Sequence, residues 1–186
     1  MENTAPAKEP RLLWVLIIVL LASMYTYAAY FDPTSPEKTV ENFYQAYFTK
    51  DYNAVASNSS VFWAVRFLPQ YAEMTPTELV NNRAKIEADI IKVIASMEKS
   101  NPIPKDIKIE IMKEYTKKGN YGAIVVYQFK EAGKTGGTEA AILIKEAGRF
   151  RIFTMTTVDP QGLDQVKAVD VNELDANFSQ LLTPEE

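Results

Sequence analysis

The chain has 186 residues, 47% of them hydrophobic, which is enough for one domain with a core of its own. Its net charge of −4 gives no basic surface for a phosphate backbone, so nucleic acid is not an expected partner. It has no Cys and no His, which excludes disulfides, thiolate nucleophiles and imidazole ligands, so we expect no catalytic residue, no metal and no cofactor.

An uncharged run of apolar residues covers positions 12–31 near the N-terminus. At about 1.5 Å per residue a helix of this length spans a bilayer's hydrocarbon core of roughly 30 Å. Trp14 stands near one end and Tyr25, Tyr27 and Tyr30 near the other, as in interfacial aromatic belts. The pattern predicts a transmembrane helix.

The orientation follows from basic residues near this run. Lys8 and Arg11 precede it, whereas the next basic residue is Lys38. The positive-inside rule therefore predicts a cytoplasmic segment 1–11 and a domain outside the cytoplasm, in a single-pass protein of the cell membrane. A signal peptide cleaved after Ala28, with Thr26 two residues before, is the alternative.

A linker at 32–36 with two prolines ends the membrane segment. Ser35 is a plausible N-cap with Pro36 at the first helical position, and an aromatic stripe at helical spacing follows through Phe48. Asp51 predicts the cap of a second helical turn to residue 55. After a break at 58–60, residues 61–68 are apolar enough to be buried on most sides.

The next element is one long predicted helix over 76–99. Thr75 and Glu78 form a capping box, Pro76 occupies the first helical position, and the Pro-containing segment 101–104 stops the helix.

Beyond residue 106 the periodicity changes to two, which predicts strands near 107–111, 121–129, 138–146 and 149–158. Their turns are expected at 117–120, at 131–137 with Gly136 and Gly137 in a hairpin turn, and at Ala147-Gly148. Connections this short require antiparallel pairing.

The fold class is therefore α+β: an N-terminal transmembrane helix, then about three helices on one face of a curved, antiparallel four-stranded sheet, and a C-terminal helix. The domain is expected at 37–160. The tail, 161–186, carries a short amphipathic helix with Asp170 and Glu173 in a capping box.

Residues 36–55 resemble the opening helix of the cystatin-like, cone-shaped superfamily typified by nuclear transport factor two. The resemblance is carried by an aromatic-rich helix that ends in Lys50-Asp51-Tyr52 and turns into a second helix. It implies three helices and a curved sheet over about 35–160, around a conical cavity. Bacterial relatives with an N-terminal anchor include extracytoplasmic domains of unknown function and scaffold subunits of type IV secretion systems.

In that superfamily, enzymes use Asp, His and Tyr in the cavity for proton transfer. The resemblance implies a ligand site here lined by aromatic residues: Tyr44, Tyr47, Trp63, Tyr127 and Phe150. The alternative is that these rings fill the cavity as a packed core. Arg66 could bind an anion there or bring its charge to the surface. Asp89 could be a base or a solvated helix position.

The predicted function is non-enzymatic: a membrane-tethered extracytoplasmic module that binds or scaffolds an envelope protein, or pairs with itself as a homodimer. The alternative is a small-ligand-binding domain that uses the cone cavity, and an enzyme working with carboxylate and Tyr chemistry is a distant third. An open cavity with an ionisable residue would favour a ligand, whereas a filled one with an exposed apolar patch would favour a protein partner.

Overall fold

The computed structural model describes residues 17–23, 35–100 and 106–183, and the chain divides into two units, Met1–Pro33 and Thr34–Glu186. Residues 17–23 are helical. The rest of the predicted membrane segment, 12–31, and the predicted cytoplasmic residues 1–11 lie outside the described residues. Within the described ranges, no helix is both long enough and apolar enough to cross a membrane.

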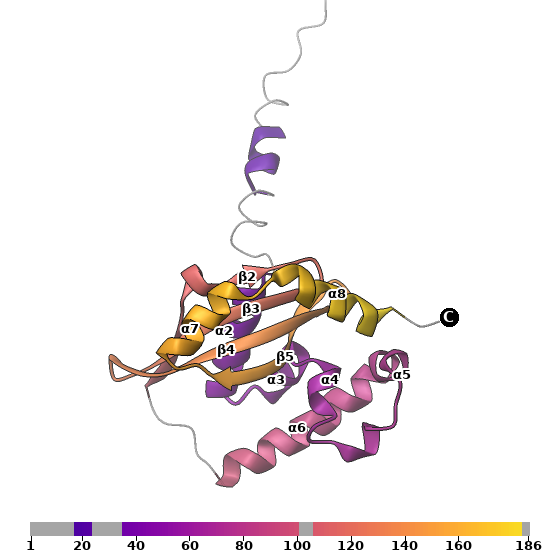
Figure 1. The fold of residues 1–186 in the computed structure, drawn as a ribbon. Coiled ribbons are helices and arrows are strands. Elements are labelled where there is room, and N and C mark those ends of the chain that lie inside the picture. The colour runs from indigo at the N-terminus through magenta and orange to yellow at the C-terminus, as the bar shows by residue number, and fades with distance from the viewer. Residues whose placement is uncertain (1–16, 24–34, 101–105, 184–186) are drawn as a thin grey trace, which may run out of the picture. The chain divides into compact units, whose positions relative to one another are not determined.

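The second unit begins with a group of helices and ends with two more around a sheet (Figure 1). The first group comprises α2 (Pro36–Phe48), α3 (Tyr52–Asn58), α4 (Val61–Ala64), the 3₁₀ turn η1 (Pro69–Tyr71), α5 (Pro76–Asn81) and α6 (Arg83–Ser100). The C-terminal helices are α7 (Pro160–Ala168) and α8 (Val171–Leu182).

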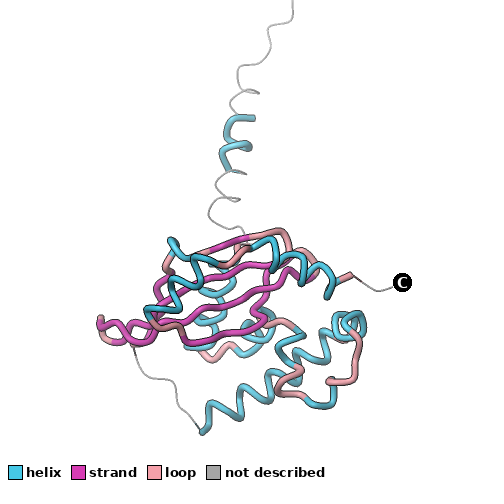
Figure 2. Tube along the Cα trace, in the orientation of Figure 1, coloured by secondary structure: helices cyan, strands magenta, loops and turns pink. Residues whose placement is uncertain are grey.

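The sheet is antiparallel and five-stranded (Figure 2). Its strands are β1 (Ile107–Ile111), β2 (Lys117–Lys118), β3 (Gly122–Glu131), β4 (Lys134–Glu146) and β5 (Arg149–Thr157), with η2 (Lys113–Tyr115) between the first two. The order is β1-β3-β4-β5, and β2 pairs with β3 beyond β1. The α+β class and the antiparallel sheet are thus confirmed.

The N-caps predicted from the sequence are present, but at α8 Asp170 accepts from the Asn172 N–H at 2.9 Å without the predicted capping box to Glu173. The Ser35 side chain accepts from the Lys38 N–H at 3.4 Å, and Asp51 accepts from the Ala54 N–H at 3.1 Å. Thr75 and Glu78 form the reciprocal capping box of α5. Each cap gives an N-terminal backbone N–H a partner, which fixes where the helix begins.

The single helix predicted over 76–99 is wrong, because the chain forms two helices that break at Asn82. The Asn82 backbone leaves helical geometry at ψ 12°, and its side chain donates back to the Glu78 carbonyl at 2.8 Å. Asn competes for backbone hydrogen bonds in this way, so it favours helix ends.

The prediction of four strands is also wrong, since β2 occupies part of the expected turn at 117–120. The hairpin between β3 and β4 is tighter than expected, with Ala132 and Gly133 both at positive φ, as a two-residue turn requires. Gly136 and Gly137 therefore lie within β4, where the pairing register shifts opposite Phe129.

Helices cover both faces of the sheet, not one as predicted (Figure 1). Alternate residues of β3 point to opposite faces: Val125 packs with α2–α6 in the large core, whereas Val126 packs with residues of α7 and α8. The sequence predicted one short helix in the 161–186 tail. The structure has two, and α8 packs on β3 within the same unit.

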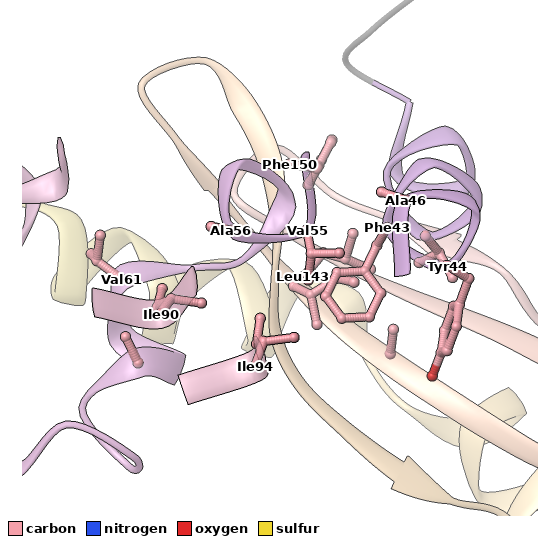
Figure 3. Close-up of a cluster of buried hydrophobic side chains, with 14 of the residues drawn as sticks. Phe43, Tyr44, Ala46, Val55, Ala56, Val61, Ile90, Ile94, Leu143 and Phe150 are labelled. Carbon is pink, nitrogen blue, oxygen red and sulfur yellow. The ribbon is translucent and has the colours of Figure 1, made fainter. Parts of the chain in front are cut away.

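The large core lies between the first helices and the sheet. Figure 3 shows Phe43 of α2 beside Val55 of α3 and Leu143 of β4. Phe43 is 4% exposed, and Val55 and Leu143 are fully buried. Burying a side chain of this size contributes about 1.5–3 kcal/mol, so this layer holds α2 and α3 on the sheet.

Candidate functional site

Two of the predicted site residues come together in the structure. Tyr44 of α2 and Tyr127 of β3 lie with their hydroxyl oxygens 2.8 Å apart. Both also contact the same carboxylate oxygen of Glu139 on β4, Tyr44 at 3.0 Å and Tyr127 at 2.7 Å. The antiparallel register places Glu139 directly opposite Tyr127, which brings its side chain under the two rings.

These three oxygens satisfy one another in the core. Burial raises the pKa of Tyr127 far above its ordinary value, and the neighbouring Tyr44 and Glu139 raise it further. Burial also raises the pKa of Tyr44, although the hydrogen bond with Tyr127 opposes this. Both hydroxyls therefore keep their protons at physiological pH, so they act as hydrogen-bond donors and not as bases.

The space around the tyrosines is filled by other rings. Tyr44 lies 5.1 Å from Tyr127 and 5.3 Å from Phe129, centroid to centroid, and Phe48 is 5.6 Å away. Tyr44 is 7% exposed and Tyr127 is fully buried. Phe150 is buried in the same core, and Tyr47 is partly buried against it. These rings pack against one another as a core, which matches the alternative that the aromatic side chains fill the cavity and do not line an open one.

Trp63 and Arg66 lie apart from the two tyrosines. Trp63 of α4 packs edge-on against Phe43, at 6.3 Å between ring centroids. Arg66 is exposed, and its guanidinium donates to the Thr154 hydroxyl on β5 at 3.1 Å. Arg66 therefore ties the end of α4 to the edge of the sheet.

An apolar groove lies between α4 and α6, next to Trp63. It encloses about 80 Å³, and the described residues that line it are all apolar: Trp63, Ala64, Phe67, Leu68, Ile90, Val93, Ile94 and Met97. Phe67 is 44% exposed and Met97 is 49% exposed. The Phe67 ring rests against Trp63 at 5.1 Å, so the groove has a fixed wall.

A larger and more polar groove lies on the opposite face of the sheet, between α7 and strands β4 and β5. Its volume is about 690 Å³. Ile124, Ala140 and Ile142 form its apolar floor, and Thr and Gln side chains line its walls. Among the described residues of its lining, only Asp159 is charged, and its carboxylate caps α7 by accepting from the Gly162 N–H at 2.7 Å.

Sequence reasoning missed a buried ionic cluster around Glu146. This β4 carboxylate is 1% exposed, accepts from the Ser60 hydroxyl and contacts the Arg83 guanidinium, with Arg151 Nε at 4.0 Å. Glu87 pairs with Arg83 at 3.1 Å, so two carboxylates balance two guanidinium groups. Burial and the neighbouring Arg151 lower the pKa of Arg83. The cluster joins α6 to β4, β5 and the start of α4, which is a structural role.

A second missed residue is Asp175 of α8. Its carboxylate accepts from three consecutive backbone N–H groups at 2.5–2.9 Å: Asn120, Tyr121 and Gly122. Burial alone would raise the pKa of Asp175, but the three donors outweigh it, and the pKa lies below its ordinary value. The contact anchors α8 to the turn before β3.

Asp89 has partners on the helix surface. The Tyr71 hydroxyl donates to it at 2.8 Å and the Lys92 ammonium at 2.7 Å. The hydrogen bond from Lys92, followed by that from Tyr71, lowers the pKa of Asp89, which makes it a poor general base.

Within the described residues, no three His, Cys, Asp or Glu side chains lie together as metal ligands would. A scan of protein-family models finds no match to the chain, and searches of curated proteins and of solved structures find none either. The resemblance to the cone-shaped superfamily therefore stays an expectation, and the surfaces of the domain carry the remaining functional information.

Proposed function

We propose that this chain is a non-enzymatic, membrane-tethered module of the cell envelope that binds another protein through the groove between α4 and α6. One observation carries the proposal: the aromatic core around Tyr44 is packed, whereas Phe67 and Met97, which line the groove, are exposed to solvent. A tether at 12–31 with the domain outside the cytoplasm is part of the proposal and follows from the sequence alone.

The chemistry of the groove suits a protein partner. Aromatic residues and Met are enriched at interface centres, and a fully desolvated pocket is where a partner side chain gains most. A volume of about 80 Å³ admits a small apolar side chain and excludes a drug-sized ligand, which requires several hundred cubic ångströms. The partner should therefore insert a small aliphatic side chain as its anchor.

The charges near the groove lie outside it. Lys92 is solvated on α6 and pairs with Asp89, and Arg66 is held by Thr154. This arrangement gives an apolar centre beside a polar surface, as in transient protein interfaces.

The test is site-specific photocrosslinking in the native envelope, with a photoreactive residue at position 67, 97 or 92. Positions 67 and 97 should give the same discrete adduct with one other protein, and position 92, exposed on the same helix, should give none. Absence of an adduct at 67 and 97, or equal labelling from all three positions, would overturn the proposal.

The same groove can be tested by substitution. Met97→Ser should abolish the adduct from position 67 and leave the free energy of unfolding within about 0.5 kcal/mol of wild type, because Met97 is half exposed. Lys92→Ser is the matched control and should retain the adduct. An adduct that survives Met97→Ser would place the partner elsewhere.

Small-ligand binding remains the second candidate, and the groove of about 690 Å³ beside α7 favours it. Its size suits a small molecule, and its Thr and Gln walls over an apolar floor suit an uncharged, amphipathic one. Such a ligand should raise the unfolding temperature of wild type, and Ile142→Trp, which fills the floor, should remove that rise. Equal stabilisation of both proteins would exclude this groove.

A further inference from the structure

The outer edge of β1 presents its backbone hydrogen-bonding groups away from the sheet. The Met112 N–H donates to the Val126 carbonyl at 2.8 Å, which fixes the alternation of the antiparallel ladder with β3. In such a ladder every second residue bonds to the partner strand, so Lys108 and Glu110 bond to β3. The N–H and C=O groups of Ile107, Ile109 and Ile111 therefore face outward.

The two edges of the sheet differ in how they are covered. At β5, Ser59 forms a bridge with Ile152, Ser60 N–H donates to the Ile152 carbonyl at 2.9 Å, and Arg66 donates to Thr154. At β1, no segment from the described ranges pairs with the outer edge. An uncovered edge is a template for another strand.

The sequence of β1, Ile-Lys-Ile-Glu-Ile, is complementary to itself when two copies run antiparallel. With a twofold axis at Ile109, Lys108 of one copy lies opposite Glu110 of the other, and Ile107 lies opposite Ile111. The same register makes the outward backbone groups of the three isoleucines hydrogen-bonded pairs. The charged pairs, the apolar pairs and the backbone hydrogen bonds are thus all satisfied in the same register, with the twofold axis at Ile109.

The side chains of β1 are placed for this pairing. Glu110 is 65% exposed and reaches Lys130 within its own chain at 3.1 Å, which leaves its carboxylate open on one side. Lys108 is exposed and has no ion pair to another described residue. Ile109 and Ile111 are only partly buried against the core, so a second copy would cover their remaining surface.

We propose that two copies of this chain form a symmetric dimer by antiparallel pairing of their β1 strands about Ile109. The two sheets then form one continuous sheet, and the interface is isologous, as twofold symmetry requires. This surface lies across the sheet from the α4/α6 groove, which packs beside β5. The proposal is therefore independent of the proposed function.

The first experiment is disulfide crosslinking of the full chain, whose lack of Cys gives a clean background. Ile109→Cys should crosslink to itself, because a hydrogen-bonded antiparallel pair has Cα atoms about 5.5 Å apart, within disulfide range. Lys108→Cys should not, because two copies of position 108 would lie roughly 8 Å apart, two residues along the partner strand. Equal crosslinking by both, or none by Ile109→Cys, would overturn the register.

The second experiment exchanges the charges and measures self-association of the detergent-solubilised full chain. In a homodimer of Lys108→Glu, position 108 of each copy places an acidic residue opposite Glu110 of the other. In a homodimer of Glu110→Lys, both of these pairs are basic. Each should weaken the homodimer roughly tenfold or more. A mixture of the two variants should form heterodimers, because the acidic residues 108 and 110 of one variant then lie opposite the basic residues 110 and 108 of the other.

The mixing result separates pairing from misfolding. A variant that had lost its fold would not recover by mixing, whereas two folded strands of opposite charge would. Homodimers that persist in both single variants, or a mixture that stays monomeric, would refute pairing through β1.

Discussion

Replacing Asp175 by Ala should loosen α8 from the sheet and destabilise the domain by about 2–3 kcal/mol. The carboxylate accepts from three backbone N–H groups at 2.5–2.9 Å. The loss should be smaller than the sum of three charged hydrogen bonds. Asn120 and Tyr121 are exposed, so water can replace the carboxylate there, and only the buried Gly122 N–H is left without a partner.

The measurement is urea unfolding at neutral pH of a chain that starts at Asp32, monitored by circular dichroism. Asp164→Ala, on the exposed surface of α7, is the control and should change stability by less than about 0.5 kcal/mol. A loss below 0.5 kcal/mol for Asp175→Ala would refute the reasoning, because α8 would then be held by its apolar face alone.

The same carboxylate predicts a pH dependence. Its pKa is lower in the folded chain than in the unfolded one, where Asp titrates near about 3.9. A lowered pKa gives stability that is complete above the unfolded value and lost as the pH falls through the folded value. The stability difference between wild type and Asp175→Asn should therefore be constant from about pH 5 to 7 and shrink below about pH 4. A difference that grows in acid would contradict the assignment.

Three further predictions concern other parts of the chain. Phe43→Ala should cost about 3–5 kcal/mol in the same urea assay, since the ring is 4% exposed; a near-zero loss would favour a cavity. Gly122→Ala should destabilise, because its Cβ would lie 2.8 Å from Leu174 Cγ, whereas Gly137→Ala meets nothing within 4 Å and should be nearly neutral; equal effects would contradict the tight docking of α8. A reporter active only outside the cytoplasm should work after Glu186 in a membrane-bound full chain; a soluble product cut near Ala28 would show a signal peptide.

Local rules predicted the elements whose signals lie within a few residues. Ser35-Pro36 and Thr75-Pro76 mark helix starts in any context, because the side chain and the N–H that it caps are three residues apart. The alternation in 121–129 predicted β3, and strict antiparallel pairing followed from the short turns. The packing of Tyr44 and Tyr127 was one of two alternatives that the pattern allowed.

Elements with short or mixed signals were missed. β2 has two lysines and no alternation, so only its pairing with β3 makes it a strand. The helix α7 does carry a start signal, Asp159 followed by Pro160, but its few apolar positions do not give a helical pattern that predicts it. The break at Asn82 was hidden because the apolar spacing continues through it.

The missed polar residues depend on distances along the chain that no local pattern contains. Tyr44 lies 95 residues from Glu139, and Gly122 lies 53 residues from Asp175. From the sequence alone, Glu139 is a charged residue in a strand, which is typical of a solvated position. Only the pairing register shows that it lies opposite Tyr127. Such partners follow from topology, which a single sequence does not determine.

The two proposed surfaces lie at opposite edges of the sheet, and this has a consequence for binding. A dimer through β1 leaves both α4/α6 grooves uncovered, since the grooves pack beside β5. Two grooves in one assembly raise the effective concentration for a partner that is itself dimeric, so its dissociation from the dimer should slow without any new contact. Lys108→Glu should then speed that dissociation while the photo-adduct from position 97 persists. If the adduct disappears with the dimer, the groove must be completed by the second copy, and the two surfaces would form one site.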